Sequence, residues 1–116
     1  MPVRKSRRYL RIWVRGARGF ASKEVSDAIQ KGVLSLYGFH GLSLLESTLI
    51  EFEEAEQMGI LRCNRSHLQE MRASLAFIVN IGDSSAAVHV ARASGTIKSL
   101  RSHRDDFLGR AEASEK

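Results

Sequence analysis

The segment at residues 59–101 reads GILRCNRSHLQEMRASLAFIVNIGDSSAAVHVARASGTIKSLR, and its pattern decides the fold. A short apolar strand at its start, residues 59–63, runs into arginines. Amphipathic spacing then predicts a helix, which Gly82 closes. A second strand spans residues 86–93, and another helix begins at Thr96. The segment therefore predicts strand, helix, strand and helix, in that order.

The two helices of this segment have recognisable starts and apolar faces. Ser66 and Gln69 form a capping box for the first helix. Its inward positions are Leu68, Met71, Leu75, Ile78 and Val79. The second helix extends to about residue 108, and its apolar stripe is Ile97, Leu100, Phe107 and Leu108.

The preceding half of the chain supplies the rest of the fold. Residues 8–15 alternate between apolar and polar side chains, which predicts a half-buried strand. Ser22 caps a helix that Gly38 ends. The inward positions of this helix are Val25, Ala28, Ile29, Val33 and Leu36. Residues 48–53 read as a strand that pairs back on residues 59–63 as a hairpin.

The resulting order is β-α-β-β-α-β followed by a C-terminal helix. This predicts an α+β protein with the ferredoxin-like, RRM-like split βαβ arrangement, an antiparallel sheet with the helices on one face. The 116 residues, 43% of them apolar, suit a single domain spanning residues 1–116. We expect a core of about residues 8–108, a short basic N-terminal arm at residues 1–7 and a frayed tail at residues 109–116.

Positive charge is segregated along the chain, whose formal net charge is +5. The first 18 residues contain no acid and seven cations, namely Arg4, Lys5, Arg7, Arg8, Arg11, Arg15 and Arg18. Acids gather instead at Glu46, Glu51, Glu53, Glu54 and Glu56. Such a surface can steer nucleic acid to one side of a protein. A merely basic soluble domain is the alternative.

Cysteine content and hydropathy favour a cytoplasmic protein. The only cysteine is Cys63, which excludes an internal disulfide framework. No apolar run approaches the roughly 18 residues needed to cross a bilayer. The basic N-terminus lacks the apolar core of a signal peptide because Arg11 interrupts it.

One sheet face stays available opposite the helices in this architecture. Alternation places Tyr9, Arg11, Trp13 and Arg15 on it. Aromatic rings stack on bases and arginines neutralise phosphates, so Tyr9 and Trp13 are candidate stacking residues. Equally, this face could dock a protein partner or lie under the C-terminal helix.

A tight turn before the last helix is a candidate anion site, formed by Ser94, Gly95 and Thr96. Lys98 and Arg101 follow closely, although the same residues also suit an ordinary capped helix. Arg62, Arg65 and Arg72 are further candidate phosphate contacts, with plain surface solvation as the alternative reading.

Catalytic chemistry has little support in the sequence. Cys63 with His67 could suggest a nucleophile and its base, but a buried inert thiol is the simpler reading. A cluster of acids could bind magnesium, yet a solvated hairpin explains it better. Its members are Glu51, Glu53, Glu54 and Glu56. We therefore predict no catalytic residue and no metal ligand in this chain.

Six short segments resemble protein component 2 of archaeal ribonuclease P, the archaeal and eukaryotic processing-of-precursor subunit family. They are RYL at 8–10, LYG at 36–38, LIEF at 49–52, GILRCNR at 59–65, RASLA at 72–76 and SGTIKSLR at 94–101. The resemblance covers roughly residues 8–103.

This resemblance implies a subunit of the ribonucleoprotein that removes the 5′ leader from precursor tRNA. It implies that the RNA holds the active site and its magnesium ions, and that the chain itself binds no cofactor. It also implies pairing with protein component 3, two pairs joining as a heterotetramer, and only indirect contact with precursor tRNA. The positions carried over as RNA contacts are Arg8, Arg62, Arg65, Lys98 and Arg101. The basic segments add Arg7, Arg11, Arg72 and Arg104.

Three other functions are compatible with the fold. A generic RNA-binding module would use the same cations without a ribozyme partner. A small-ligand regulatory domain would need a pocket lined by a polar constellation, which the sequence does not suggest. A stand-alone nuclease would need catalytic carboxylates.

Overall fold

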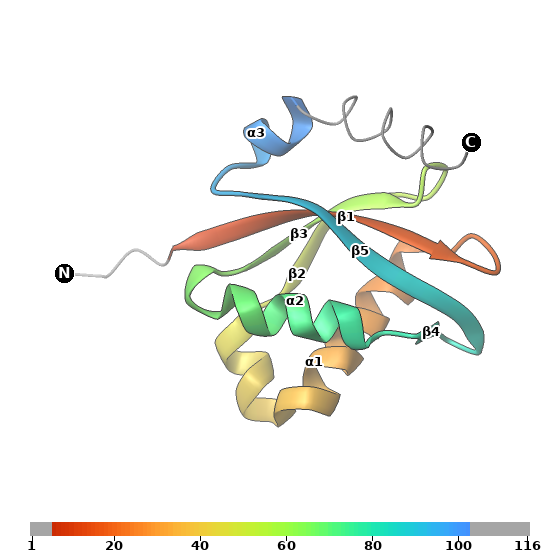
Figure 1. Cartoon of the computed structure of the whole chain (residues 1–116), viewed down its shortest axis with the longest axis horizontal. Coiled ribbons are helices and arrows are strands. Elements are labelled where there is room, and N and C mark those ends of the chain that lie inside the picture. The colour runs from red at the N-terminus through yellow and green to blue at the C-terminus, as the bar shows by residue number, and fades with distance from the viewer. Residues whose placement is uncertain (1–5, 103–116) are drawn as a thin grey trace.

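The computed structural model describes residues 6–102, which form an antiparallel sheet and its covering helices (Figure 1). The strands are β1 (Arg7–Gly16), β2 (Thr48–Glu53), β3 (Met58–Asn64), β4 (Asn80–Ile81) and β5 (Ser84–Ser94). The helices are α1 (Ser22–Leu45), α2 (Leu68–Phe77) and α3 (Ile97–Ser102), with a 3-10 turn η1 (Arg65–His67) before α2. The predicted α+β class is confirmed.

The sheet has the split βαβ topology. Its strand order is β2-β3-β1-β5-β4, and every neighbouring pair is antiparallel. Because β3 runs between β1 and β2, these two strands point the same way and α1 joins them as the crossover. β1 is the central strand, paired with β3 on one side and β5 on the other.

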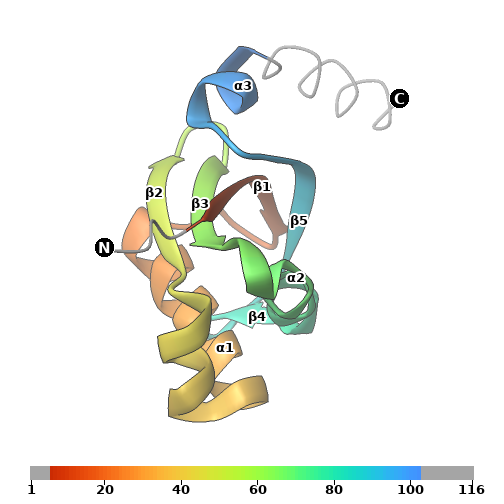
Figure 2. The same ribbon diagram turned by 90° about the vertical axis from the view of Figure 1, so that its left-hand side faces the viewer.

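The main core lies between the sheet and the helices α1 and α2, which pack together on one sheet face (Figure 2). Leu10, Ile12 and Val14 alternate toward these helices and are buried, as predicted. They meet Val25, Ile29 and Val33 of α1, and Met71 and Leu75 of α2. Burial of each such side chain contributes about 1.5–3 kcal/mol, so this layer dominates the stability of the fold.

Helix α3 lies on the opposite face of the sheet, where it contacts β1 and β5 (Figure 1). Leu100 is only 1% exposed there, and Ile60 of β3 is buried outside the main core. The predicted C-terminal helix is confirmed as far as Ser102. Phe107 and Leu108, the N-terminal arm as far as residue 5 and the tail lie outside the described residues. Within residues 6–102, no helix is both long enough and apolar enough to cross a membrane.

A fifth strand replaces part of the predicted second helix. That helix ends at Phe77, and Gly82 forms the β4–β5 hairpin turn with Asp83, at a φ of 63°. The prediction that Gly82 closes the helix is therefore wrong. A glycine with positive φ is typical both of a helix C-terminus and of a two-residue hairpin turn, and here it forms the turn. Val79, predicted to point inward, is 66% exposed.

Helix ends also differ from expectation. Gly38 does interrupt α1, at a φ of 70°, but the helix continues to Leu45, and Leu36 is exposed. The start of α1 is capped at Ala21, whose N–H donates to Glu24 at 3.0 Å, and not at Ser22.

The start of the second helix uses a different cap from the predicted one. The side-chain oxygen of Asn64 accepts from the N–H of Ser66 at 3.0 Å, and η1 carries the chain into α2 at Leu68. Asn64 thus caps η1, and His67 takes the N-cap position of α2 without a side-chain hydrogen bond, so the predicted capping box of Ser66 and Gln69 is wrong.

Candidate nucleic-acid interface

Two strand ends that carry cations, those of β1 and β3, meet the end of β5 at one end of the sheet. β1 begins there, and its first residues lie between the last residues of β3 and β5 (Figure 1). Arg8 pairs with Cys63, while Tyr9 pairs with Arg62 on one side and Ser94 on the other. Residues separated by about 30–85 positions in the sequence thus come together only through the sheet register. We call this end, built from residues 7–9, 62–65 and 94–98, the basic edge.

Cations leave the basic edge on both faces of the sheet. Arg8 lies two residues before Leu10 in β1, so its side chain points to the helix side of the sheet. Arg62 lies two residues after Ile60 in β3, so its side chain points to the side of α3. The Nε atom of Arg62 is buried and has no hydrogen-bond partner within residues 6–102.

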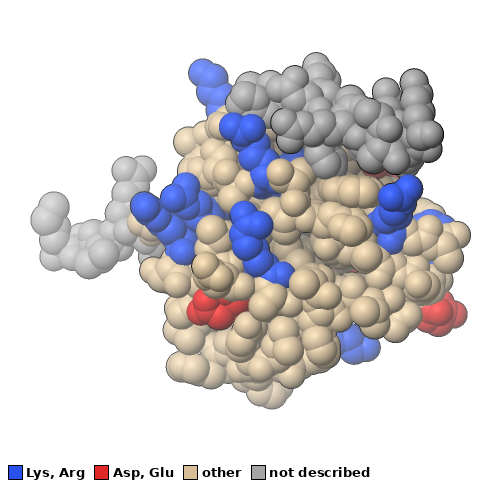
Figure 3. Space-filling view, viewed as in Figure 1, with Lys and Arg blue, Asp and Glu red and all other residues tan. Residues whose placement is uncertain are grey.

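Arg65 and Arg72 extend the basic edge along the helix side. Arg65 is exposed in η1, and its backbone N–H donates to the carbonyl of Ser6 at 3.2 Å, which ties the start of the chain to the end of β3. Arg72 is exposed on α2 close enough to Cys63 to act on that thiol electrostatically. Blue side chains gather on this part of the surface in Figure 3.

The turn at residues 94–96 joins the basic edge to α3. A Cβ built on Gly95 would lie 3.5 Å from a guanidinium nitrogen of Arg8, so that arginine reaches across to the turn. Ser94 Oγ accepts from the N–H of Thr96 at 3.2 Å, and Thr96 Oγ1 accepts from the N–H of Ser99 at 3.2 Å. These bonds are those of an ordinary helix cap. They leave the anion site at this turn a prediction.

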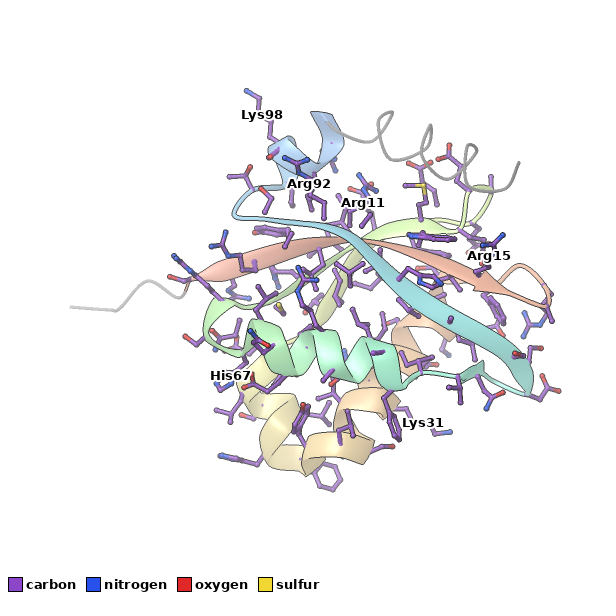
Figure 4. The ribbon with its side chains drawn as sticks, viewed as in Figure 1. Arg11, Arg15, Lys31, His67, Arg92 and Lys98 are labelled. Carbon is purple, nitrogen blue, oxygen red and sulfur yellow. The ribbon has the colours of Figure 1, made fainter. Side chains whose placement is uncertain are left out.

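Two of the predicted contacts are engaged with acids. Arg101 donates to Glu51 Oε1 at 2.5 Å, and Arg7 lies 3.7 Å from Glu46. Lys98 instead projects from the top of α3 into solvent (Figure 4). Arg104 lies outside the described residues.

Arg11 does not belong to the exposed surface. It is 4% exposed on the sheet face that α3 contacts, although the sequence predicted an RNA contact. A side chain buried to this degree does not present its guanidinium to a phosphate, so we correct that prediction. We call the sheet face opposite α1 and α2 the outer face. Helix α3 covers part of this face, which was one of the alternatives that the sequence left open.

The two aromatic residues predicted on the outer face, Trp13 and Tyr9, lie in different environments. The Trp13 ring stacks on His89 of β5, with centroids 4.4 Å apart and an interplanar angle of 26°. Arg15 lies over Trp13 at 5.8 Å from the ring centroid. Tyr9 is half-buried at the basic edge. Trp13 and Tyr9 therefore do not form one aromatic surface.

Sequence reasoning missed His89 and Arg92, which are both exposed on β5. In a regular strand, alternation would place His89 and Arg92 on opposite faces. A bulge changes this, because Arg11 pairs with Arg92 whereas Ile12 pairs with Val90. Ala91 is the extra residue. A single inserted residue reverses the faces beyond it, so a simple period-2 pattern fails at this point.

Cys63, His67 and Glu54 are each buried or engaged in a hydrogen bond. Cys63 is buried as expected, and burial raises the pKa of its thiol to about 11. The Nδ1 atom of His67 lies 2.6 Å from Glu70, and this hydrogen bond holds the pKa of the Glu70 carboxyl below its ordinary value. Glu54 accepts from the N–H of Ser22 at 2.9 Å. Over residues 6–102, no three His, Cys, Asp or Glu side chains gather as a metal site would require.

Comparison with known proteins supports the resemblance seen in the sequence. Residues 8–103 match the sequence profile of the Rpp14/Pop5 family. The chain is 35% identical over 99 residues to "Ribonuclease P protein component 2" of Thermococcus gammatolerans, covering 85% of this chain and 82% of that protein. It is 33% identical over 99 residues to the protein of that name from Pyrococcus furiosus, with the same coverage.

A solved structure shares the fold. A chain in the structure titled "Cryo-EM structure of yeast Ribonuclease MRP" superposes with a TM-score of 0.69 at 14% identity, covering 99% of this chain and 93% of that one. At this identity the likeness concerns the fold alone. Because the family profile spans most of the sequence and the relatives agree with it, this chain belongs to the Rpp14/Pop5 family, a family of ribonuclease P protein subunits.

Proposed function

We propose that this chain is a protein subunit of ribonuclease P, the ribonucleoprotein that removes the 5′ leader from precursor tRNA. The observation that carries the proposal is the basic edge, where cations from the start of β1 and the end of β3 lie beside the end of β5 in a chain of this family. Phosphate contacts of this kind supply sequence-independent affinity for RNA.

The mechanism is neutralisation of RNA backbone charge. Arg8, Arg62 and Arg65 hold phosphates that would otherwise repel one another, and the catalytic domain of the RNA stays folded at a lower magnesium concentration. The RNA performs the cleavage with its own magnesium ions. This chain contributes no catalytic side chain and binds no cofactor.

The state of the candidate catalytic groups supports a non-catalytic role. A thiol with a pKa of about 11 is protonated at neutral pH, and only the thiolate is a nucleophile. The carboxylate of Glu51 is engaged with Arg101. Incubation of the purified chain with precursor tRNA and magnesium should therefore yield no cleavage. Turnover by the chain alone would favour the stand-alone nuclease.

A second surface of different chemistry suits a protein partner. Exposed apolar side chains lie on the helices and next to them: Phe77, 52% exposed, borders the same groove as Leu34 and Val79, and Phe39 of α1 is 80% exposed. A groove of about 750 Å³ lies between α1 and residues 77–82. Exposed apolar clusters of this kind commonly mark protein interfaces. We assign this surface to protein component 3, with two such pairs forming a heterotetramer.

Reconstitution tests the function. Ribonuclease P RNA and component 3 are assayed on precursor tRNA over a range of magnesium concentrations, with and without this chain. The expected result is cleavage at magnesium concentrations where the reaction without the chain fails. Identical magnesium dependence in the two reactions would contradict the proposal.

Paired variants separate the two surfaces. Phe77→Asp with Val79→Asp should abolish co-elution with component 3, because burying two carboxylates in an apolar interface is costly. Arg8→Glu with Arg62→Glu should preserve co-elution and weaken RNA binding. Co-elution that survives the aspartates would place component 3 elsewhere. A generic RNA-binding module would bind RNA without changing the magnesium dependence.

The same groove bears on the small-ligand alternative. It is open, and exposed apolar residues such as Leu34 and Val79 border it. Small-ligand sites usually bury most of the ligand surface. This difference favours a macromolecular partner.

We expect the protein to work in the cytoplasm, where precursor tRNA, ribozyme and partner subunits meet in a prokaryotic cell.

A further inference from the structure

A stacked pair of rings occupies the part of the outer face that lies beyond Arg11. Trp13 of β1 and His89 of β5 are cross-strand neighbours whose ring centroids are 4.4 Å apart. Trp13 is half-buried, whereas His89 is exposed. The imidazole is therefore the more accessible ring of the pair, and the indole packs against one of its faces.

The fold holds this pair in place from two directions. The bulge at Ala91 sets the register so that His89, and not Val88 or Val90, lies opposite Trp13. Arg11, two residues before Trp13 on the same face of β1, is buried, whereas Trp13 is half-buried. The covered part of the outer face therefore ends between these two residues. A ring supported by another ring loses little side-chain freedom when a third ring stacks on it.

Cations flank the pair. The guanidinium of Arg15 lies 5.8 Å from the Trp13 ring centroid, and Arg15 is exposed. Arg92, also exposed, follows His89 on β5, and the two arginines lie on either side of the crossing of β1 and β5 (Figure 4). An apolar protein surface would have to desolvate these charges, whereas an RNA strand has a phosphate on either side of each base.

We propose that Trp13 and His89 form a stacking platform for an unpaired nucleobase of RNA, with Arg15 and Arg92 placed to contact the phosphates beside that base. Every base presents a flat face to such a platform, so recognition depends on single-strandedness and not on sequence. In a duplex the bases already stack on one another and their faces are closed. The platform presupposes that the chain binds RNA, and it specifies that a single-stranded segment is among the RNA bound.

Trp13 is the only tryptophan of the chain and reports on its own environment. The full-length protein is titrated with a short single-stranded RNA at low salt while tryptophan fluorescence is recorded. An abasic strand of the same length and a duplex of the same sequence are the matched comparisons. Quenching by the base-bearing single strand, well beyond that by the other two, is expected.

Variants at the exposed ring locate the effect. His89→Ala should weaken binding of the base-bearing strand at least about fivefold and leave the abasic strand unchanged, because only base stacking is lost. His89→Tyr should retain binding, since a ring remains. Arg8→Glu should weaken both strands equally, because it acts through phosphate.

The outcomes are distinguishable. Equal quenching and equal affinity for base-bearing and abasic strands would overturn the platform and leave the proposed subunit function standing. The same holds if His89→Ala binds the base-bearing strand as tightly as the wild type does. Failure of the wild-type chain to bind either strand would overturn the platform together with direct RNA binding.

Discussion

The side-chain amide of Gln57 hydrogen-bonds both backbone groups of Phe20, 37 residues away in the chain. Its Oε1 accepts from the Phe20 N–H at 2.8 Å, and its Nε2 donates to the Phe20 carbonyl at 2.9 Å. The amide thereby acts as one more pairing residue between the β2–β3 turn and the loop that leads into α1. Phe20 is buried, so its backbone groups depend on this partner.

Replacing Gln57 by alanine should lower the free energy of unfolding by about 1–3 kcal/mol, because its two hydrogen bonds to Phe20 and a third to the Glu54 carbonyl are lost. Gln57 also adopts a φ of 54°. Gln57→Asn is therefore informative, since asparagine tolerates this backbone but is too short to reach Phe20. Urea unfolding measures both. Gln69→Ala, an exposed glutamine on α2, is the control and should change stability by less than about 0.5 kcal/mol. Equal stability of all three variants would refute the role of the amide.

Charge reversal at the basic edge should weaken RNA binding and flatten its salt dependence. The double variant Arg8→Glu, Arg62→Glu should bind at least about tenfold more weakly. The slope of log K against log salt should fall by about 0.7 for each phosphate of a single strand that the protein no longer neutralises. The single variant Arg8→Glu is compared with Lys31→Glu on α1, which changes the net charge by the same two units at an exposed site on the helix side, away from the basic edge (Figure 4). Similar losses of affinity in the two proteins would mean that only net charge matters.

Glu51 should restrain RNA binding by Arg101. Their hydrogen bond of 2.5 Å engages a cation that the sequence predicted as an RNA contact. Glu51→Gln removes the competing charge, so RNA affinity should rise about two- to fivefold with little change in stability, as surface ion pairs contribute little to folding. In an Arg101→Ala background the same substitution should have a smaller effect. A gain of equal size in both backgrounds would exclude Arg101 as the mediator.

Glu24 should contribute to stability only above acidic pH. The hydrogen bond from Arg18, followed by that from the Ala21 N–H, lowers the pKa of its carboxyl to about 2. A carboxylate whose pKa is depressed on folding stabilises the fold above its unfolded pKa of about 4.3, and this contribution fades as the pH falls toward 2. The melting temperature of Glu24→Gln should therefore lie below that of the wild type at pH 6, and the gap should narrow below about pH 4 and close only near pH 2. A gap independent of pH would assign the effect to the helix cap instead.

Local patterns in the sequence predicted most of the scaffold. The alternation of Leu10, Ile12 and Val14, the bounds of β2 and the break at Gly38 all depend on neighbours within a few positions. Strand and helix periods of 2 and 3.6 residues express themselves over that range, so they can be identified without tertiary information. The prediction failed at Gly82, because a glycine at that position is compatible with a helix end and with a hairpin turn.

The composition and order of the sequence therefore determined an antiparallel α+β scaffold and the residues that carry its positive charge. Only the tertiary structure decided which of those charges are usable: it buried Arg11, engaged Arg101 with Glu51 and gathered Arg8, Arg62 and the turn at Gly95 at one edge. It also brought His89 onto Trp13 through a one-residue bulge. These relationships join residues up to about 85 positions apart. They depend on strand register and helix placement, which the packing of the whole chain sets and no local period encodes.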